Sequence, residues 1–272
     1  MKKRLAMILA LAMMMSTTAV AADVEAAGGS SDASVKATYE EGTDASAVIF
    51  SVDIEWEGLS FTYYEESNPV WDPTTHDYTS GEYQAEGWDK SQAGTVTVTN
   101  HSNTDILANF TYGAKSGFES ATMNFDFAQI YVASPVADKT EKTSSNSVVP
   151  GGTLPEGTED AEIGTITVTI SQCADKTKND ALNEMAVYET YLAGVDQHIT
   201  DGKIQKVNNR ADATDGTPYI LTGMYQQMIS DHSRLAAAIK DGTPGQDEIN
   251  EAYYTLYAYG QFLFALDQQA RQ

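Results

Sequence analysis

Cysteine and positively charged residues are scarce in this chain of 272 residues. The single cysteine, Cys173, cannot form a disulfide within the chain and cannot by itself build a zinc or iron–sulfur site. Only 16 Lys and Arg residues stand against 39 Asp and Glu residues, which gives a formal charge of −23. A surface this acidic repels phosphate backbones and anionic lipids, which argues against nucleic acid as a partner.

Long hydrophobic runs are also missing. The apolar run from Leu5 to Met15 is too short for a bilayer, which needs about 20 residues. It follows the basic residues 2–4 and precedes small residues around Ala21, the arrangement of a secretory signal peptide. We therefore expect a signal peptide over 1–21 and an extracellular or cell-envelope protein with no membrane segment after cleavage. The Ala-, Gly-, Ser- and Asp-rich residues 22–34 are expected to form a flexible lead-in.

Motifs for catalysis are lacking as well. The chain has no Gly-x-Ser-x-Gly, no His-Glu-x-x-His and no phosphate-binding glycine loop, and carboxylates are too numerous for one pair to stand out. We therefore expect no enzymatic activity and no cofactor. Calcium stays open as an alternative, because two acidic segments supply hard oxygen ligands without the helix–loop–helix spacing. These segments contain Asp72, Asp77 and Glu82, and Asp212 and Asp215.

An alternating pattern of apolar and polar residues dominates residues 35–172. Val96 and Val98, for example, lie between threonines, which is typical of a strand with one solvated face. Seven or eight such strands, separated by Gly, Asn and Ser turns, predict an antiparallel β-sandwich domain over 35–172. The apolar phase slips between Phe127 and Ile130, which suggests a β-bulge.

Two insertions interrupt this pattern. Residues 134–162 hold three of the seven prolines and many Ser, Thr and Gly residues, which favours a mobile flap outside the core. Residues 65–94 are rich in aromatic and acidic side chains, which offer stacking surfaces beside hydrogen-bond acceptors. Because binding residues collect on loops at one end of a sandwich, we predict a ligand-binding face in this segment. Its predicted members are Trp71, Asp72, Asp77, Tyr78, Tyr83 and Trp88.

Helical spacing begins after Asp175. Apolar residues recur at three- and four-residue intervals in three stretches, which predicts a three-helix bundle over 175–272. Thr217-Pro218 and Thr243-Pro244 each place a capping hydroxyl before a proline, so we expect the second and third helices to begin there. The predicted fold class is thus α+β with two domains, an Ig-like antiparallel β-sandwich followed by a three-helix bundle.

Both halves of the chain contain stretches that are similar to known families. The helical half, through residues 219–239, 243–249 and 253–256, resembles the FIVAR-type three-helix module of Gram-positive surface proteins. The β half, through 52–56 and 71–78 among other stretches, resembles an Ig-like sandwich domain of secreted and surface proteins of gut clostridia. The first resemblance implies a non-catalytic stalk or glycan-binding spacer, and the second implies a location outside the cell.

These observations together predict a secreted, non-catalytic protein of the cell envelope that serves adhesion or displays a glycan-binding domain on a helical spacer. The expected partner is a cell-wall or host glycan, or another envelope protein. The alternative is a secreted hydrolase acting on polysaccharides, or an accessory carbohydrate-binding subunit of one, with catalysis by clustered carboxylates.

Overall fold

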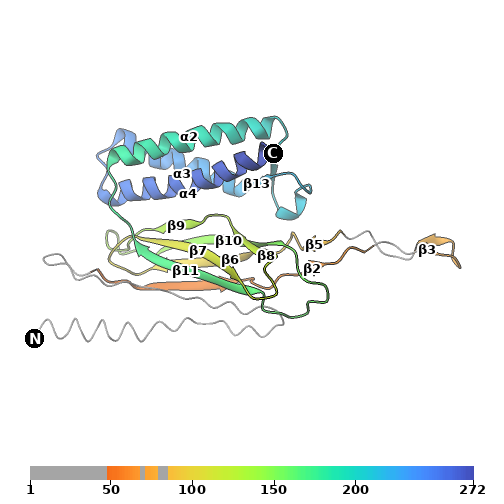
Figure 1. Ribbon diagram of the computed structural model, residues 1–272. Helices are drawn as coiled ribbons and strands as arrows, with labels where there is room; N and C mark the ends of the chain where they lie inside the picture. Colours follow the sequence, from red (N-terminus) through yellow and green to blue (C-terminus); the bar gives the residue numbers. More distant parts are fainter. Residues whose placement is uncertain (1–47, 68–70, 79–84) are drawn as a thin grey trace, which may run out of the picture.

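The structure is a computed structural model that describes residues 48–67, 71–78 and 85–272. Within these residues it is a mixed α+β protein, in which antiparallel strands precede three α-helices along the chain (Figure 1). The expected signal peptide 1–21 and lead-in 22–34 lie outside the described residues, as do the first residues of the expected β domain.

A four-stranded antiparallel sheet contains the first strand described. In spatial order its strands are β1 (Val52–Glu57), β6 (Gly94–Asn100), β10 (Lys142–Gly152) and β8 (Ala121–Phe125). The predicted alternation is confirmed in β6, where Val96 and Val98 are fully buried and the threonines between them are partly exposed. On the opposite face, hydroxyl groups pair across strands, as in Thr97 with Ser145 at 3.0 Å.

A three-stranded antiparallel sheet faces the first one across a shared core. Its spatial order is β11 (Gly164–Gln172), β7 (Ile106–Ala114) and β9 (Gln129–Val132). One cluster of buried apolar side chains draws on both sheets, with Trp56 packed at its margin. The cluster consists of Val96, Val98, Ile106, Ala108, Phe110, Ile130, Val132, Val168 and Ile170.

The strand β10 corrects the prediction of a mobile flap over 134–162. Residues 142–152 form an interior strand between β6 and β8, and Val148 is fully buried. Asn146 is also buried, because its side chain bonds both main-chain groups of Phe127, accepting from the N–H at 3.0 Å and donating to the carbonyl at 2.6 Å. The prediction fails because serine, threonine and this satisfied asparagine occupy positions where an interior strand usually shows apolar residues.

The phase slip near Phe127 also has a different cause from the predicted bulge. The strand β8 ends at Phe125 and β9 begins at Gln129, and the two strands belong to different sheets. Residues 126–128 therefore carry the chain from one sheet to the other. Phe125 and Ile130 reach the same core from opposite sides, which shifts the apolar phase without inserting a residue into one strand.

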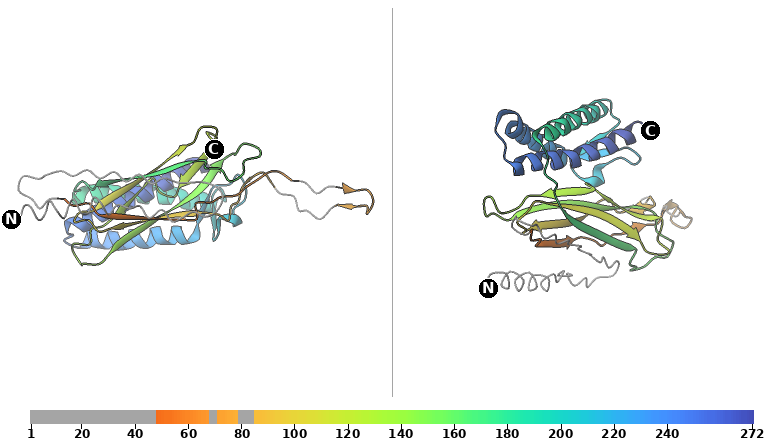
Figure 2. Two further views of the ribbon diagram at one scale, coloured as in Figure 1. Left: turned by 90° about the horizontal axis from the view of Figure 1, so that it is seen from below. Right: turned by 60° about the vertical axis from the view of Figure 1, so that its left-hand side comes forward.

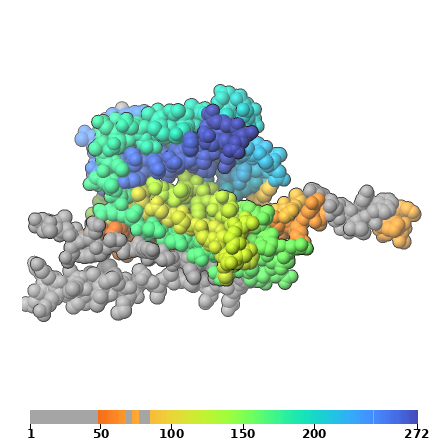
Figure 3. All heavy atoms as spheres, viewed as in Figure 1, coloured from red at the N-terminus to blue at the C-terminus, as the bar shows by residue number. Residues whose placement is uncertain are grey.

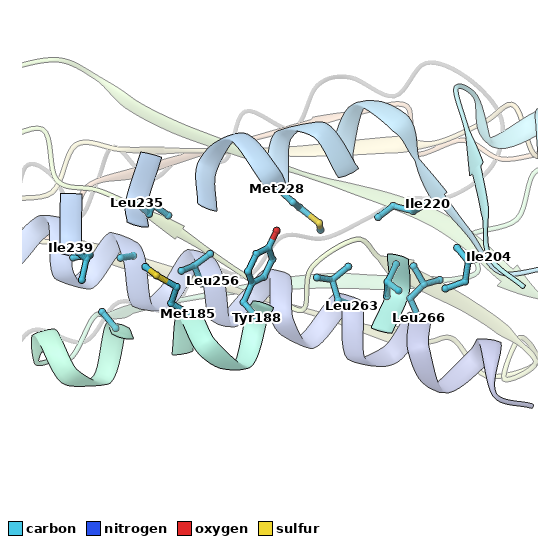
Figure 4. Close-up of a cluster of buried hydrophobic side chains, with 13 residues drawn as sticks. Met185, Tyr188, Ile204, Ile220, Met228, Leu235, Ile239, Leu256, Leu263 and Leu266 are labelled. Atoms are coloured by element: carbon cyan, nitrogen blue, oxygen red, sulfur yellow. The ribbon is translucent and has the colours of Figure 1, made fainter. Parts of the chain in front are cut away.

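Three helices follow in the described chain: α2 (Lys178–Thr200), α3 (Thr222–Asp241) and α4 (Gln246–Ala270). Their apolar stripes meet in a second buried cluster around Met185, Tyr188 and Leu256 (Figure 4). Thr177 caps α2, since its hydroxyl accepts from the N–H of Asp180 at 3.1 Å. None of the helices in the described part of the chain is long and apolar enough for a bilayer crossing.

Two predicted helix starts are wrong. Residues Tyr219–Leu221 form β13, which pairs in parallel with β12 (Gln205–Val207), so α3 begins at Thr222 rather than after Thr217. The start of α4 is at Gln246 rather than after Thr243. The residue before a proline is restricted to extended backbone, and that conformation suits entry into a strand or turn as well as a helix cap.

The helices lie as a layer over the strands (Figures 2 and 3), with α4 against β9. Phe127 contacts the rings of Tyr259 and Phe262, at centroid separations of 5.4 and 6.0 Å. Tyr131 of β9 stacks on Tyr254 of α4 at 6.1 Å. Aromatic pairs between residues 127–131 and α4 therefore form an aromatic seam between the sheets and the helices.

An ion pair adds a polar contact to this seam. In the short 3₁₀-helix η1 (Arg210–Asp212), Arg210 donates to both carboxylate oxygens of Asp126, at 2.9 and 3.0 Å, and to the hydroxyl of Ser147 at 2.9 Å. Both charged side chains are only 13% exposed. Burial raises the pKa of the Asp126 carboxyl, and the facing guanidinium offsets part of that effect.

Candidate binding groove

A two-stranded ribbon positions two aromatic rings of the predicted binding segment. The strands β2 (Tyr63–Tyr64) and β5 (Gly87–Trp88) are antiparallel, with Tyr63 opposite Trp88. The rings of these two residues meet edge to face, with centroids 5.2 Å apart and planes at 84°. The adjacent Tyr64 is 38% exposed and, by the alternation of a strand, points to the other side of the ribbon.

A hydrogen bond to the sheet holds the Trp88 ring in place. The indole N–H donates to the carbonyl of Gly152, at the end of β10, at 3.0 Å. Gly152 has a φ of +68°, and a Cβ atom there would lie 1.9 Å from the carbonyl oxygen of Ser120. Only glycine fits this position. The backbone conformation therefore requires that the residue accepting the Trp88 hydrogen bond be a glycine.

Polar contacts fix the rest of the ribbon. The main-chain N–H of Thr62 donates to the Gln92 side chain at 2.6 Å, and the Tyr63 hydroxyl donates to Glu86 at 2.8 Å. The carboxylate of Asp89 accepts from the hydroxyl and the main-chain N–H of Ser91, and these two bonds lower its pKa. These polar groups around the Tyr63–Trp88 pair are therefore hydrogen-bonded within the protein.

The rings of Tyr63 and Trp88 line an open cavity of about 510 Å³, which we call the end groove. Its other walls come from the segment between β1 and β2, from β7, β8 and the start of β11, and from the loop before β11. They consist of Leu59, Ser60, Phe61, Thr62, Tyr112, Met123, Leu154, Thr158, Glu159, Asp160, Ala161, Ile163, Gly164 and Ile166. Aromatic and apolar surface thus lies beside two exposed carboxylates, Glu159 and Asp160.

Asp160 has an unusual backbone conformation. Its φ is +44°, in the left-handed region that L-residues other than Asn and Asp rarely adopt. This conformation turns the loop back toward β11, where the Tyr112 hydroxyl donates to the carbonyl of Ile163 at 2.9 Å. The loop that carries Glu159 and Asp160 is therefore hydrogen-bonded to the sheet.

Among the predicted binding residues that the structure describes, Trp88 alone lies in the end groove. Trp71 and Asp72 (β3) pair instead with Asp77 and Tyr78 (β4) in a separate hairpin. This hairpin stands apart from the sheets in both Figure 1 and the left view of Figure 2. The sixth predicted residue, Tyr83, lies outside the described residues.

Within the hairpin, the Asp72 carboxylate accepts the main-chain N–H of Thr74 at 2.8 Å, and this bond lowers its pKa. Asp72 therefore stabilises the turn between β3 and β4.

Three of the acidic residues that suggested calcium, Asp72, Asp212 and Asp215, have partners within the protein. Asp212 accepts a hydrogen bond from the main-chain N–H of Asn209 at 3.2 Å, and Asp215 pairs with Lys90. Glu82 lies outside the described residues. In the part of the chain that the structure describes, no group of three or more His, Cys, Asp or Glu side chains is arranged to hold a metal ion.

Neither a protein-family model nor a curated protein sequence matches this chain.

Proposed function

We propose that the chain is a non-catalytic binding protein of the cell envelope whose ligand is a neutral, hydroxyl-rich glycan held in the end groove. The observation that carries the proposal is the fixed pair of rings, Tyr63 and Trp88, in one cavity with the carboxylates of Glu159 and Asp160. A flat ring packs against the C–H face of a sugar, and carboxylates accept hydrogen bonds from its hydroxyl groups.

The charge of the protein supports a neutral ligand. A chain of formal charge −23, with two exposed acids in the groove itself, repels polyanions such as teichoic acid. Each stacking contact contributes on the order of 1 kcal/mol, comparable to an aromatic pair. More than one aromatic contact is therefore needed for useful affinity, and Phe61 and Tyr112 extend the aromatic surface beyond the central pair.

The proposed location outside the cell rests on the signal-peptide pattern of residues 1–21. We further propose that the two sheets form an Ig-like sandwich and that the helices form a FIVAR-type bundle. The core cluster shared by both sheets and the interlocking helical stripes support this proposal. In that arrangement the end groove lies at one end of the sandwich, and the helical domain packs along the sandwich through α4.

Titration calorimetry with cello-, chito- and xylo-oligosaccharides tests the proposal. We expect binding of at least one series, and a loss of at least tenfold in affinity, about 1.4 kcal/mol, for Tyr63→Ala. Tyr64→Ala is the matched control, because this tyrosine is the chain neighbour on the other side of the ribbon. Asp160→Asn tests the carboxylate wall, since asparagine tolerates the left-handed backbone and the position is exposed.

Three results would contradict the proposal. The first is no binding of any of the three series, and the second is equal losses for Tyr63→Ala and Tyr64→Ala. The third is release of shorter sugars from any series, with turnover lost in Glu159→Gln. That result would favour the alternative, a polysaccharide hydrolase.

A further inference from the structure

A second cavity adjoins the end groove at Trp88. It has a volume of about 620 Å³, and we call it the joint hollow because sheet and helical residues both line it. Its lining includes Trp88, Lys90, Gln92, Arg210, Tyr219 and Gln269. Trp88 is thus a wall of both cavities.

The strand β10 shows how the two cavities are arranged. Val149 and Pro150 line the joint hollow, Gly152 receives the Trp88 hydrogen bond, and Leu154 lines the end groove. Trp88 is therefore bonded to the end of β10, between the residues of that segment that line the two cavities. Gln92, in the joint hollow, bonds Thr62, in the end groove, so the cavities also meet along the ribbon.

The joint hollow has both apolar and polar walls, and its cations are already paired. Lys90 bonds Asp215, and Arg210 bonds Asp126. A carboxylate therefore neutralises each cation, and neither cation favours an anionic ligand. Amide and hydroxyl groups, such as those of Gln269 and Tyr219, remain as the hydrogen-bonding surface, and they suit a neutral ligand rich in hydroxyl groups.

From this arrangement we infer that the ligand is an extended oligosaccharide that passes over Trp88, with one end in the end groove and the other in the joint hollow. This inference rests on the proposed function and adds the ligand's length and its contact with the helices. Each cavity alone has a volume within the roughly 300–1,000 Å³ of small-molecule sites. A ligand that occupies both cavities is therefore longer than one that occupies either cavity alone.

Affinity should then depend on the length of the sugar chain. We expect hexasaccharides of the bound series to bind at least tenfold more tightly than disaccharides. Gln269→Ala should weaken hexasaccharide binding at least threefold and leave disaccharide binding unchanged, because this exposed side chain of α4 lines the joint hollow and not the end groove. Gln226→Ala, at an exposed position of α3, is the matched control.

Titration calorimetry on the full chain, with disaccharides and hexasaccharides of the cello, chito and xylo series, measures these effects. Equal affinities for the two lengths, or a hexasaccharide affinity unaffected by Gln269→Ala, would overturn the inference and leave the proposed function standing. No binding at either length, in any series, would overturn both.

Discussion

The ion pair between Arg210 and Asp126 gives the sharpest prediction for stability. Arg210→Met keeps much of the side-chain volume and removes the guanidinium, so Asp126 is left buried without its partner. Removal of one member of a buried, hydrogen-bonded pair costs about 3–5 kcal/mol. With both side chains only 13% exposed and three short hydrogen bonds lost, we expect a loss in that range at pH 7.

The loss should depend on pH. Burial already raises the pKa of Asp126, and without Arg210 the guanidinium no longer offsets this effect. A carboxyl whose pKa is higher in the folded than in the unfolded state takes up its proton preferentially on folding, so acid favours the folded variant. Each further unit by which the pKa rises is equivalent to about 1.36 kcal/mol. The deficit of the variant relative to the native protein should therefore shrink as the pH falls from 7 toward 5.

Urea unfolding followed by circular dichroism at pH 7 and pH 5 measures this deficit. Lys115→Met is the control, because Lys115 pairs with Glu162 at the surface, where such pairs contribute about 0–1 kcal/mol. The double change Arg210→Met with Asp126→Asn should lose less than Arg210→Met alone, since no buried charge remains. An Arg210→Met variant that loses no more than Lys115→Met, or loses the same amount at both pH values, would refute this reasoning.

Four further changes test other parts of the structure. Tyr188→Phe should raise the free energy of unfolding by about 1 kcal/mol, because the phenol oxygen of this buried residue (Figure 4) has no hydrogen-bond partner. Gly152→Ala should cost at least about 2 kcal/mol in urea unfolding, from a positive φ and a main-chain clash, and should alter tryptophan fluorescence. Asp267→Asn should cost about 1–3 kcal/mol in urea unfolding at pH 7, since hydrogen bonds from Arg271 lower the pKa of Asp267. This difference should narrow in acid, where the native carboxylate protonates and loses the same stabilisation. The fragment 175–272 should show cooperative helix melting by circular dichroism, whereas a coil spectrum would mean that its aromatic face needs the sheets.

Sequence patterns predict those parts of the fold in which neighbouring residues carry the signal. Val96 and Val98 between threonines mark a half-buried strand, and the three-four spacing around Met185 and Leu235 marks helices that share a core. The interior strand β10 escapes detection because Asn146 is buried by bonding the main chain of a residue 19 positions away, a partner that no local pattern indicates.

The candidate site shows the same limit. The cluster of aromatic residues identifies the right segment, and Trp88 within it, but the opposite walls come from Tyr112 and from Glu159 and Asp160. These residues are far from Trp88 in sequence, and the pairing of β7 with β11 brings Tyr112 beside the loop that carries the two carboxylates. Aromatic composition alone cannot separate Trp71, in a detached hairpin, from Trp88, which bonds the sheet.

The position of β10 also has a consequence for the order of folding. The strand lies between β6 and β8, yet it is the last of the four strands in its sheet to be synthesised. Until residue 152 emerges, β6 and β8 each lack a neighbour and present unpaired edges. The other sheet must wait for β11, whereas each helix that follows is held by main-chain hydrogen bonds within its own segment. We therefore expect the helices to form fast and the sheets to assemble slowly and late. During synthesis, both sheets should stay incomplete until the middle third of the chain has been made.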